Sequence, residues 1–138
     1  MSLKIWMPLN GDLRNYGTTK LPSPSRTQVT YGSGKMGTSA TCVIGWHLDE
    51  EILGNTWSVA MWVKPASLGV YNNILFCKNT SSTSDCQIYF SIAQDTTLNL
   101  GINNHSSDVT GAASFTAGTW YHVAATYDGS IGTIYLNG

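Results

Sequence analysis

Apolar and polar residues alternate along most of this chain with the period of two that is typical of β-strands. The clearest case is residues 87–102, where two alternating runs flank the turn sequence QDTT. The polar residues Gln87, Ser91 and Asn99 fall on one face of this predicted hairpin. The other face collects six apolar side chains, which we expect in the core: Ile88, Phe90, Ile92, Leu98, Leu100 and Ile102.

A second hairpin is predicted over residues 120–138, where WYHVAATYDGS is followed by TIYLNG. β-Branched and aromatic residues fill both runs, as strands prefer. The pairs Asp128-Gly129 and Asn137-Gly138 supply residues that tolerate the positive φ of tight turns. We therefore expect two antiparallel strands with a turn after each.

The segment WSVAMWV at residues 57–63 is apolar in both of its alternating sets. This pattern predicts a strand with two buried faces, in the middle of a layered structure, that ends at Pro65. We expect four tryptophans of the strand patterns in the core: Trp6, Trp57, Trp62 and Trp120.

Further strands are expected at residues 5–9 and 40–44, and no window shows a convincing helical period. Many short strands separated by turn signals indicate an all-β sandwich. A chain of 138 residues suits a single domain, here residues 1–138.

Only 11% of the residues are charged, and the net charge is −1. There is thus no basic patch for nucleic acid, and no apolar run has the length of a membrane helix. We expect neither a nucleic-acid partner nor a membrane partner.

Five segments resemble laminin G-like domains of the concanavalin A-like lectin/glucanase superfamily, of the kind found in phage, prophage and bacterial surface proteins. They are, in chain order, KIWMPLNGDL (4–13), GKMG (34–37), WSVAMWVKP (57–65), ILFCK (74–78) and the hairpin at 120–138. The resemblance implies a jelly-roll sandwich of two antiparallel sheets.

Domains of this family normally continue beyond the turn that matches Asn137-Gly138. The resemblance therefore implies a domain that lacks its C-terminal strands. We expect such a chain to pair with the remainder of a longer protein or to self-associate, at the strand edge beside Ile5, Met7 and Leu9.

The arrangement of the eight acidic residues gives little support for a catalytic site. Glycosidases need two carboxylates that face one sugar, whereas the contiguous Asp49, Glu50 and Glu51 diverge on an extended strand. No nucleophile motif accompanies His122, which we interpret as a packed structural histidine. We predict that the protein is not an enzyme.

Candidate ligand-binding residues occur in three segments: at a strand end at residue 46, in the loop at 69–73 and in the loop at 103–108. Aromatic rings beside amides suit sugars, because rings stack on pyranose C–H groups while amides bind hydroxyls. The alternative is that these are ordinary loop residues. The six candidates are Trp46, Tyr71, Asn72, Asn73, Asn104 and His105.

We expect no cofactor and no metal. Calcium, which some relatives bind, is the alternative, but residues 103–108 offer one or two candidate oxygens for a site that needs six to eight.

Cys77 and Cys86 flank a turn-like stretch, so a hairpin there would make them neighbours across two strands. Two readings stay open: ordinary small strand residues or a cross-strand disulfide, depending on the redox compartment. Cys42 is expected to be a buried apolar residue.

The resemblance, together with these observations, implies a non-catalytic carbohydrate- or ligand-recognition module for adhesion, in a phage tail or virion protein or a bacterial surface protein. Its location would be the virion, the cell surface or the extracellular space. The alternatives are a structural module without a small ligand, and a carbohydrate-active enzyme or its accessory module.

Overall fold

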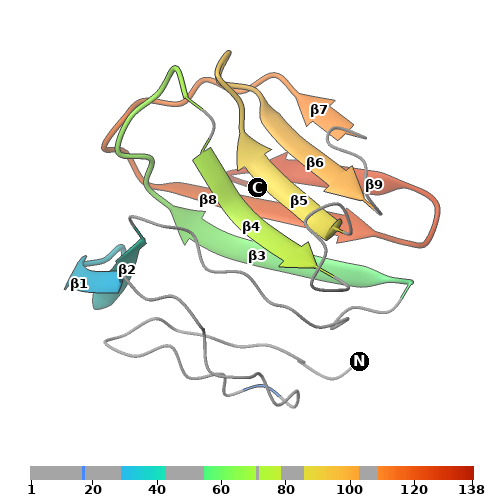
Figure 1. Cartoon of the computed structure of the whole chain (residues 1–138), viewed down its shortest axis with the longest axis horizontal. Coiled ribbons are helices and arrows are strands. Elements are labelled where there is room, and N and C mark those ends of the chain that lie inside the picture. The colour runs from blue at the N-terminus through green and yellow to red at the C-terminus, as the bar shows by residue number, and fades with distance from the viewer. Residues whose placement is uncertain (1–16, 18–28, 43–54, 71, 79–85, 103–108) are drawn as a thin grey trace. The chain divides into compact units, whose positions relative to one another are not determined.

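The computed structural model describes residue 17 and residues 29–42, 55–70, 72–78, 86–102 and 109–138 (Figure 1). The chain forms two compact parts, Met1–Leu48 and Asp49–Gly138, which we describe separately. The described residues contain nine strands and no helix. The predicted all-β class is confirmed.

In the first part, the described residues 29–42 form an antiparallel hairpin of β1 (Val29–Ser33) and β2 (Thr38–Cys42). Its turn is the GKMG sequence, in which the Gly34 N–H donates to the Gly37 carbonyl at 2.9 Å. Gly37 has a φ of 68°, which favours glycine. The strand predicted at 40–44 therefore begins two residues earlier, because this turn sets the start of the pairing.

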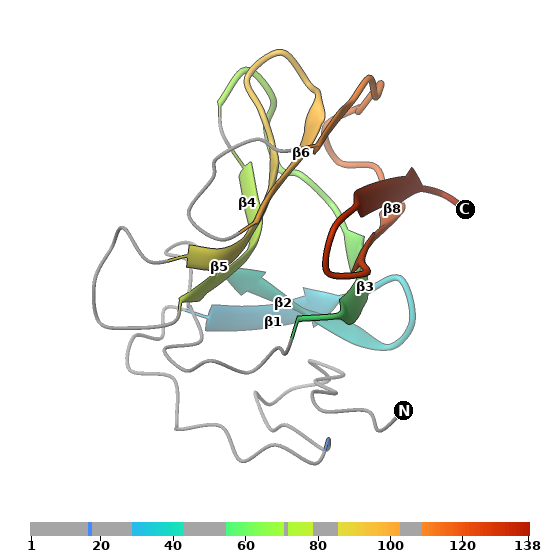
Figure 2. The ribbon, with the colours of Figure 1, turned by 90° about the vertical axis from the view of Figure 1, so that its right-hand side faces the viewer.

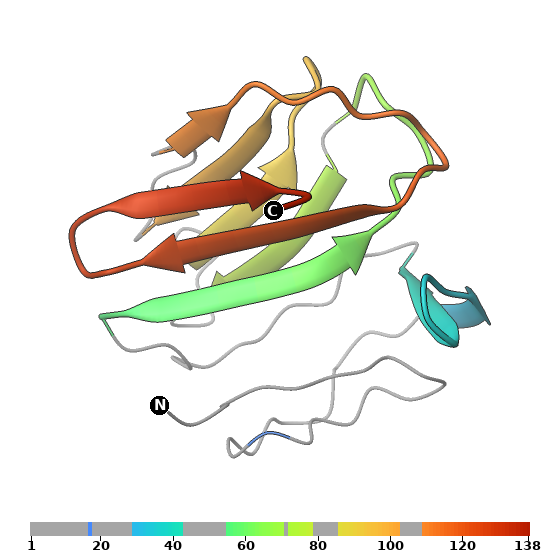
Figure 3. The ribbon, with the colours of Figure 1, turned by 180° about the vertical axis from the view of Figure 1, so that it is seen from behind.

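The second part consists of two antiparallel sheets (Figures 1 and 3). A three-stranded sheet has the order β3-β8-β9, with bounds Trp57–Val63, Tyr121–Tyr127 and Gly132–Leu136. A four-stranded sheet is a meander of β4 (Asn72–Lys78), β5 (Cys86–Ile92), β6 (Leu98–Ile102) and β7 (Val109–Gly111).

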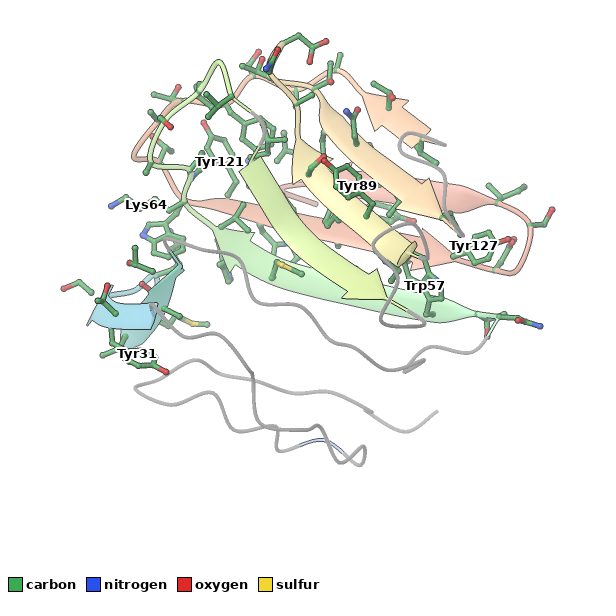
Figure 4. All side chains as sticks on the ribbon, in the orientation of Figure 1. Tyr31, Trp57, Lys64, Tyr89, Tyr121 and Tyr127 are labelled. Atoms are coloured by element: carbon green, nitrogen blue, oxygen red, sulfur yellow. The ribbon has the colours of Figure 1, made fainter. Side chains whose placement is uncertain are left out.

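The core of this part lies between the two sheets, which face each other in Figure 2. All six apolar side chains predicted for the core face of the 87–102 hairpin are buried. Trp57, Val123 and Ala125 are buried on the opposing sheet. Trp57 also packs on Tyr127, with ring centroids 5.7 Å apart (Figure 4). The predicted sandwich and hairpin register are confirmed.

The turn between β5 and β6 also matches its prediction. The Ala93 N–H donates to the Thr97 carbonyl at 2.9 Å, which closes the QDTT segment. Thr96 takes a φ of 68°, and Asp95 accepts hydrogen bonds at Oδ1 from the Thr97 hydroxyl at 2.7 Å and the Thr97 N–H at 3.1 Å. The short polar side chain thus stabilises the turn locally.

The prediction that β3 has two buried faces is wrong. Trp57 is buried as expected, but Ala60 is exposed and Trp62 has 41% of its surface exposed. Trp120 is half-buried. The reason is that the three-stranded sheet packs against the four-stranded sheet through one face only, so the four-stranded sheet does not cover side chains on the other face. Trp6 lies outside them.

The β4–β5 ladder places the two cysteines on neighbouring strands. Cys77 is opposite Ile88 and Lys78 is opposite Cys86, with an irregularity in the register between these pairs. The cysteines are therefore offset by one ladder position. The disulfide remains a prediction.

Candidate functional site

The face of the three-stranded sheet that points away from the core carries an unusual mixture of side chains. Its residues are every second position of three strands, because successive side chains alternate between the two faces. We call this set the outer face: Ser58, Ala60, Trp62, His122, Ala124, Thr126, Thr133 and Tyr135.

The ladder registers arrange the outer face in rows across the strands. Trp62 pairs with His122 in the first row. The second row is Ala60, Ala124 and Tyr135. The third row contains only alcohols, namely Ser58, Thr126 and Thr133. Trp62 and Tyr135 therefore lie on the two outer strands in adjacent rows, with His122 and Ala124 between them on β8.

Both large rings on the outer face are open to solvent. Trp62 is 41% exposed and Tyr135 is 43% exposed. The Trp62 ring also contacts the His122 ring edge to face, with centroids 5.3 Å apart and planes inclined by 63°. His122 is therefore packed, as predicted, but against an exposed ring rather than in the core. Its contact orients the indole on the sheet surface.

A lysine marks one end of the outer face. The Lys64 Nζ lies 5.9 Å from the centroid of the Trp120 ring, beyond the end of β3 (Figure 4). At that range the ammonium is attracted to the ring face. No acidic residue belongs to the outer face as defined, since the described carboxylates, Asp95 and Asp128, belong to turns.

Side-chain hydrogen bonds hold both ends of the β8–β9 hairpin that supports this face. Asn137 donates its N–H to the His122 carbonyl at 2.8 Å and accepts the His122 N–H at Oδ1 at 3.0 Å. At the other end, Asp128 Oδ1 accepts the N–H groups of Ile131 at 2.7 Å and Ser130 at 2.8 Å. These bonds, first that from Ile131, lower the pKa of the Asp128 carboxyl.

The outer surface of the four-stranded sheet has a different, polar character. Asn73, Ser91, Asn99 and Thr110 are paired in one row across β4 to β7. Ser91 and Asn99 are on the face of the sheet that points away from the core, as predicted. Both are nevertheless buried. Within the described part of the chain the Ser91 hydroxyl has no hydrogen-bond partner. Buried side chains of this kind do not offer an accessible binding surface.

The structure describes only two of the six predicted ligand-binding residues. Asn72 and Asn73 begin β4, opposite Ile92 and Ser91. The other four lie outside the described residues: Trp46, Tyr71, Asn104 and His105. A loop site built from these residues therefore remains a prediction.

Sequence reasoning missed the exposed rings of the outer face. Alternation places Ala60 and Trp62 on the face opposite Trp57, but their apolar character predicts burial there as well. The same alternation puts Tyr135 opposite Ile134 and Leu136. The sequence signal for these exposed rings is that each alternates onto a face whose other residues are mostly alanines and alcohols.

The described residues show neither a metal-binding cluster nor a membrane-spanning helix. They contain no group of three or more histidine, cysteine, aspartate or glutamate side chains that would hold a metal ion. They also contain no helix that is long and apolar enough to span a membrane.

Comparison with protein families matches residues 36–138 to a laminin G-like model described as the concanavalin A-like lectin/glucanases superfamily. Residues 4–13, which resemble the family's opening strand, lie outside this match. No curated protein and no solved structure matches the chain. The matched region contains β3 to β9 and both sheets of the sandwich. The chain therefore belongs to the laminin G-like family of the concanavalin A-like lectin/glucanase superfamily.

Proposed function

We propose that this domain is a non-catalytic module that binds carbohydrate on the outer face of its three-stranded sheet. The observation that carries the proposal is the pair of exposed rings, Trp62 and Tyr135, around the small residues Ala60 and Ala124. Aromatic rings present a flat apolar surface to the C–H groups of a pyranose. Neighbouring alcohols donate and accept hydrogen bonds with sugar hydroxyls.

The family supports this assignment at a coarser level, since a concanavalin A-like domain is compatible with carbohydrate or ligand binding. The resemblance to phage and bacterial surface proteins favours a tail, virion or cell-surface location. An adhesion role fits that location, because a binding module without catalysis retains its ligand.

The described carboxylates favour binding over hydrolysis. Asp95 and Asp128 belong to different turns, and each accepts hydrogen bonds from its own turn. A retaining or inverting glycosidase needs a carboxyl pair within roughly 5–10 Å on either side of one glycosidic bond. Each of these two carboxylates instead stabilises its own tight turn by accepting hydrogen bonds.

A glycan array probed with the labelled chain tests the binding function. We expect binding that falls at least tenfold in Trp62→Ala, because the ring supplies the stacking surface. Tyr31→Ala is the matched control, since Tyr31 is a 39% exposed aromatic residue of the other compact part. Circular dichroism confirms that each variant is folded.

Turnover assays on the array hits test the non-catalytic part of the proposal. We expect no release of reducing ends. Hydrolysis that disappears in Glu50→Gln or Glu51→Gln would contradict it and favour a carbohydrate-active enzyme. Silence in both assays would favour the second candidate, a structural module of a virion or surface protein.

A further inference from the structure

We propose that the outer face binds an internal stretch of a linear glycan, covering at least two pyranose units, rather than a single terminal sugar. This inference rests on the proposed carbohydrate-binding function and specifies its ligand. It follows from the placement of Trp62 and Tyr135 on the sheet.

The two rings are too far apart for one sugar. Trp62 is on β3 and Tyr135 is on β9, two strands away, and their rows differ by two residues along β8. Strand spacings of about 4.8 Å and a rise of about 3.3 Å per residue separate their Cβ positions by roughly 12 Å. A single pyranose ring does not span that distance, so simultaneous stacking needs linked units.

The diagonal from Trp62 to Tyr135 crosses β8 between the half-buried residues His122 and Ala124. Ala124 has only a methyl side chain and leaves room for a ligand on one side of this path. The His122 ring, which contacts Trp62, borders the other side. A linear ligand lies diagonally from Trp62 across β8 to Tyr135, with the row of Ser58, Thr126 and Thr133 along one side. These alcohols bind sugar hydroxyls that point along the sheet.

The charge on the face favours an uncharged ligand. The outer face as defined holds no carboxylate, and Lys64, which follows β3, has its ammonium over the Trp120 ring. The alcohols and rings of the outer face suit a ligand that has many hydroxyl groups and no charge. Pyranoses with mostly equatorial hydroxyls suit the two rings best, because their C–H groups form an uninterrupted apolar surface.

The size of the face argues against a second copy of the chain as its occupant. Three strands and three rows span about 300 Å², from the strand spacing and rise. A stable protein interface needs about 800 Å² per partner. A glycan chain needs far less area, because a few stacked rings and hydrogen bonds hold it.

Calorimetric titration with cello-oligosaccharides of one to six glucose units tests the inference. We expect the affinity to rise at least tenfold from the monosaccharide to the trisaccharide and then to level off. Trp62→Ala and Tyr135→Ala should each weaken trisaccharide binding at least tenfold, and Tyr31→Ala should not. Ala60→Gln places a longer side chain next to Trp62 on the exposed face of β3 without touching the core, and it should weaken trisaccharide binding as well.

The outcomes separate this inference from the proposed function. If the array shows binding but the monosaccharide binds as well as the hexasaccharide, or only branched or terminal sugars bind, the inference fails and the function stands. The inference also fails if Tyr135→Ala and Ala60→Gln leave the affinity unchanged. An absence of binding to every glycan overturns both. Concentration-dependent association that Trp62→Ala abolishes would assign the face to a second copy and overturn the inference.

Discussion

At the residue scale, short polar side chains decide how the strands of this sandwich end. Asn137 satisfies both backbone groups of His122 just beyond the β8–β9 ladder. It does so with a φ of 59°, in the left-handed region that asparagine tolerates better than most residues. One residue therefore supplies a hydrogen bond and a backbone conformation at the same time.

Two substitutions separate these contributions. Asn137→Gly keeps the positive φ and loses only the side-chain hydrogen bond, so we expect the free energy of unfolding to fall by about 1 kcal/mol. Asn137→Ala also places a Cβ in the left-handed region, which costs roughly a further 1–2 kcal/mol. Urea unfolding of both variants measures the difference. Equal stabilities would show that the backbone relaxes out of the left-handed region.

Ser91 illustrates the opposite case, a polar group that folding buries. Its side chain is fully buried, and its hydroxyl has no partner among the described residues. We expect Ser91→Ala to raise the free energy of unfolding by about 1 kcal/mol, because an unsatisfied buried hydroxyl costs about 1–3 kcal/mol. Urea unfolding tests this, with the exposed Ser58→Ala as a control that should change by less than about 0.5 kcal/mol. A loss of stability in Ser91→Ala would show that the hydroxyl is hydrogen-bonded in the folded protein.

At the scale of elements, a close approach of β9 to the meander holds the two sheets together. Gly132 lies where a Cβ would be 3.0 Å from Ile102 Cδ1 and Val109 Cγ2, and 3.3 Å from Leu100 Cδ2. Glycine is needed here for space rather than for its φ. The fit of the sheets therefore depends on the absence of one methyl group.

Gly132→Ala should accordingly be destabilising by about 1–3 kcal/mol through overpacking. Ile102→Val removes the Cδ1 atom that the new methyl group would meet, and by itself should cost about 0.5–1.5 kcal/mol. The double variant should be more stable than the sum of the two single changes predicts, because the methyl group added at position 132 fills the space that the Ile102 Cδ1 atom leaves. Chemical denaturation of the four proteins closes the cycle. Strictly additive changes in the free energy of unfolding would mean that the Ile102 side chain does not limit how closely β9 approaches the meander.

At the scale of the whole molecule, two aspartates in turns make the free energy of unfolding depend on pH. The pKa of Asp95 is lowered, first by the Thr97 hydroxyl and then by the Thr97 N–H. The pKa of Asp128 is lowered by the N–H groups of Ile131 and Ser130. A carboxyl whose folded pKa lies below its unfolded value stabilises the fold fully above the unfolded pKa. That stabilisation is lost as the pH falls through the folded pKa.

We therefore expect the free energy of unfolding to decrease below about pH 4, near the unfolded pKa of aspartate. The Asp95→Asn and Asp128→Asn double variant should lose stability less steeply between about pH 4 and pH 2, because an amide does not titrate. Urea midpoints at a series of pH values measure the slope. An identical slope in the double variant would assign the acid sensitivity to other carboxyls.

The sequence by itself determined the local parts of this protein. Alternation identified the buried face of β5 and β6, and turn dipeptides located the turn at Asp128-Gly129 and the positive φ of Asn137 and Gly138. These features were predictable because strand alternation and turn chemistry act between residues that are close in the chain. The family resemblance extended this to the sandwich class.

Only the tertiary structure decided which surfaces the remaining side chains face. β3 pairs with β8, which lies far along the sequence, and this sheet packs through one face against the β4–β7 meander. Trp62 is exposed for that reason, although its apolar character predicts burial, and Ser91 is buried although its polar character predicts exposure. Burial depends on which distant segment covers a position, and no local pattern along one strand contains that information.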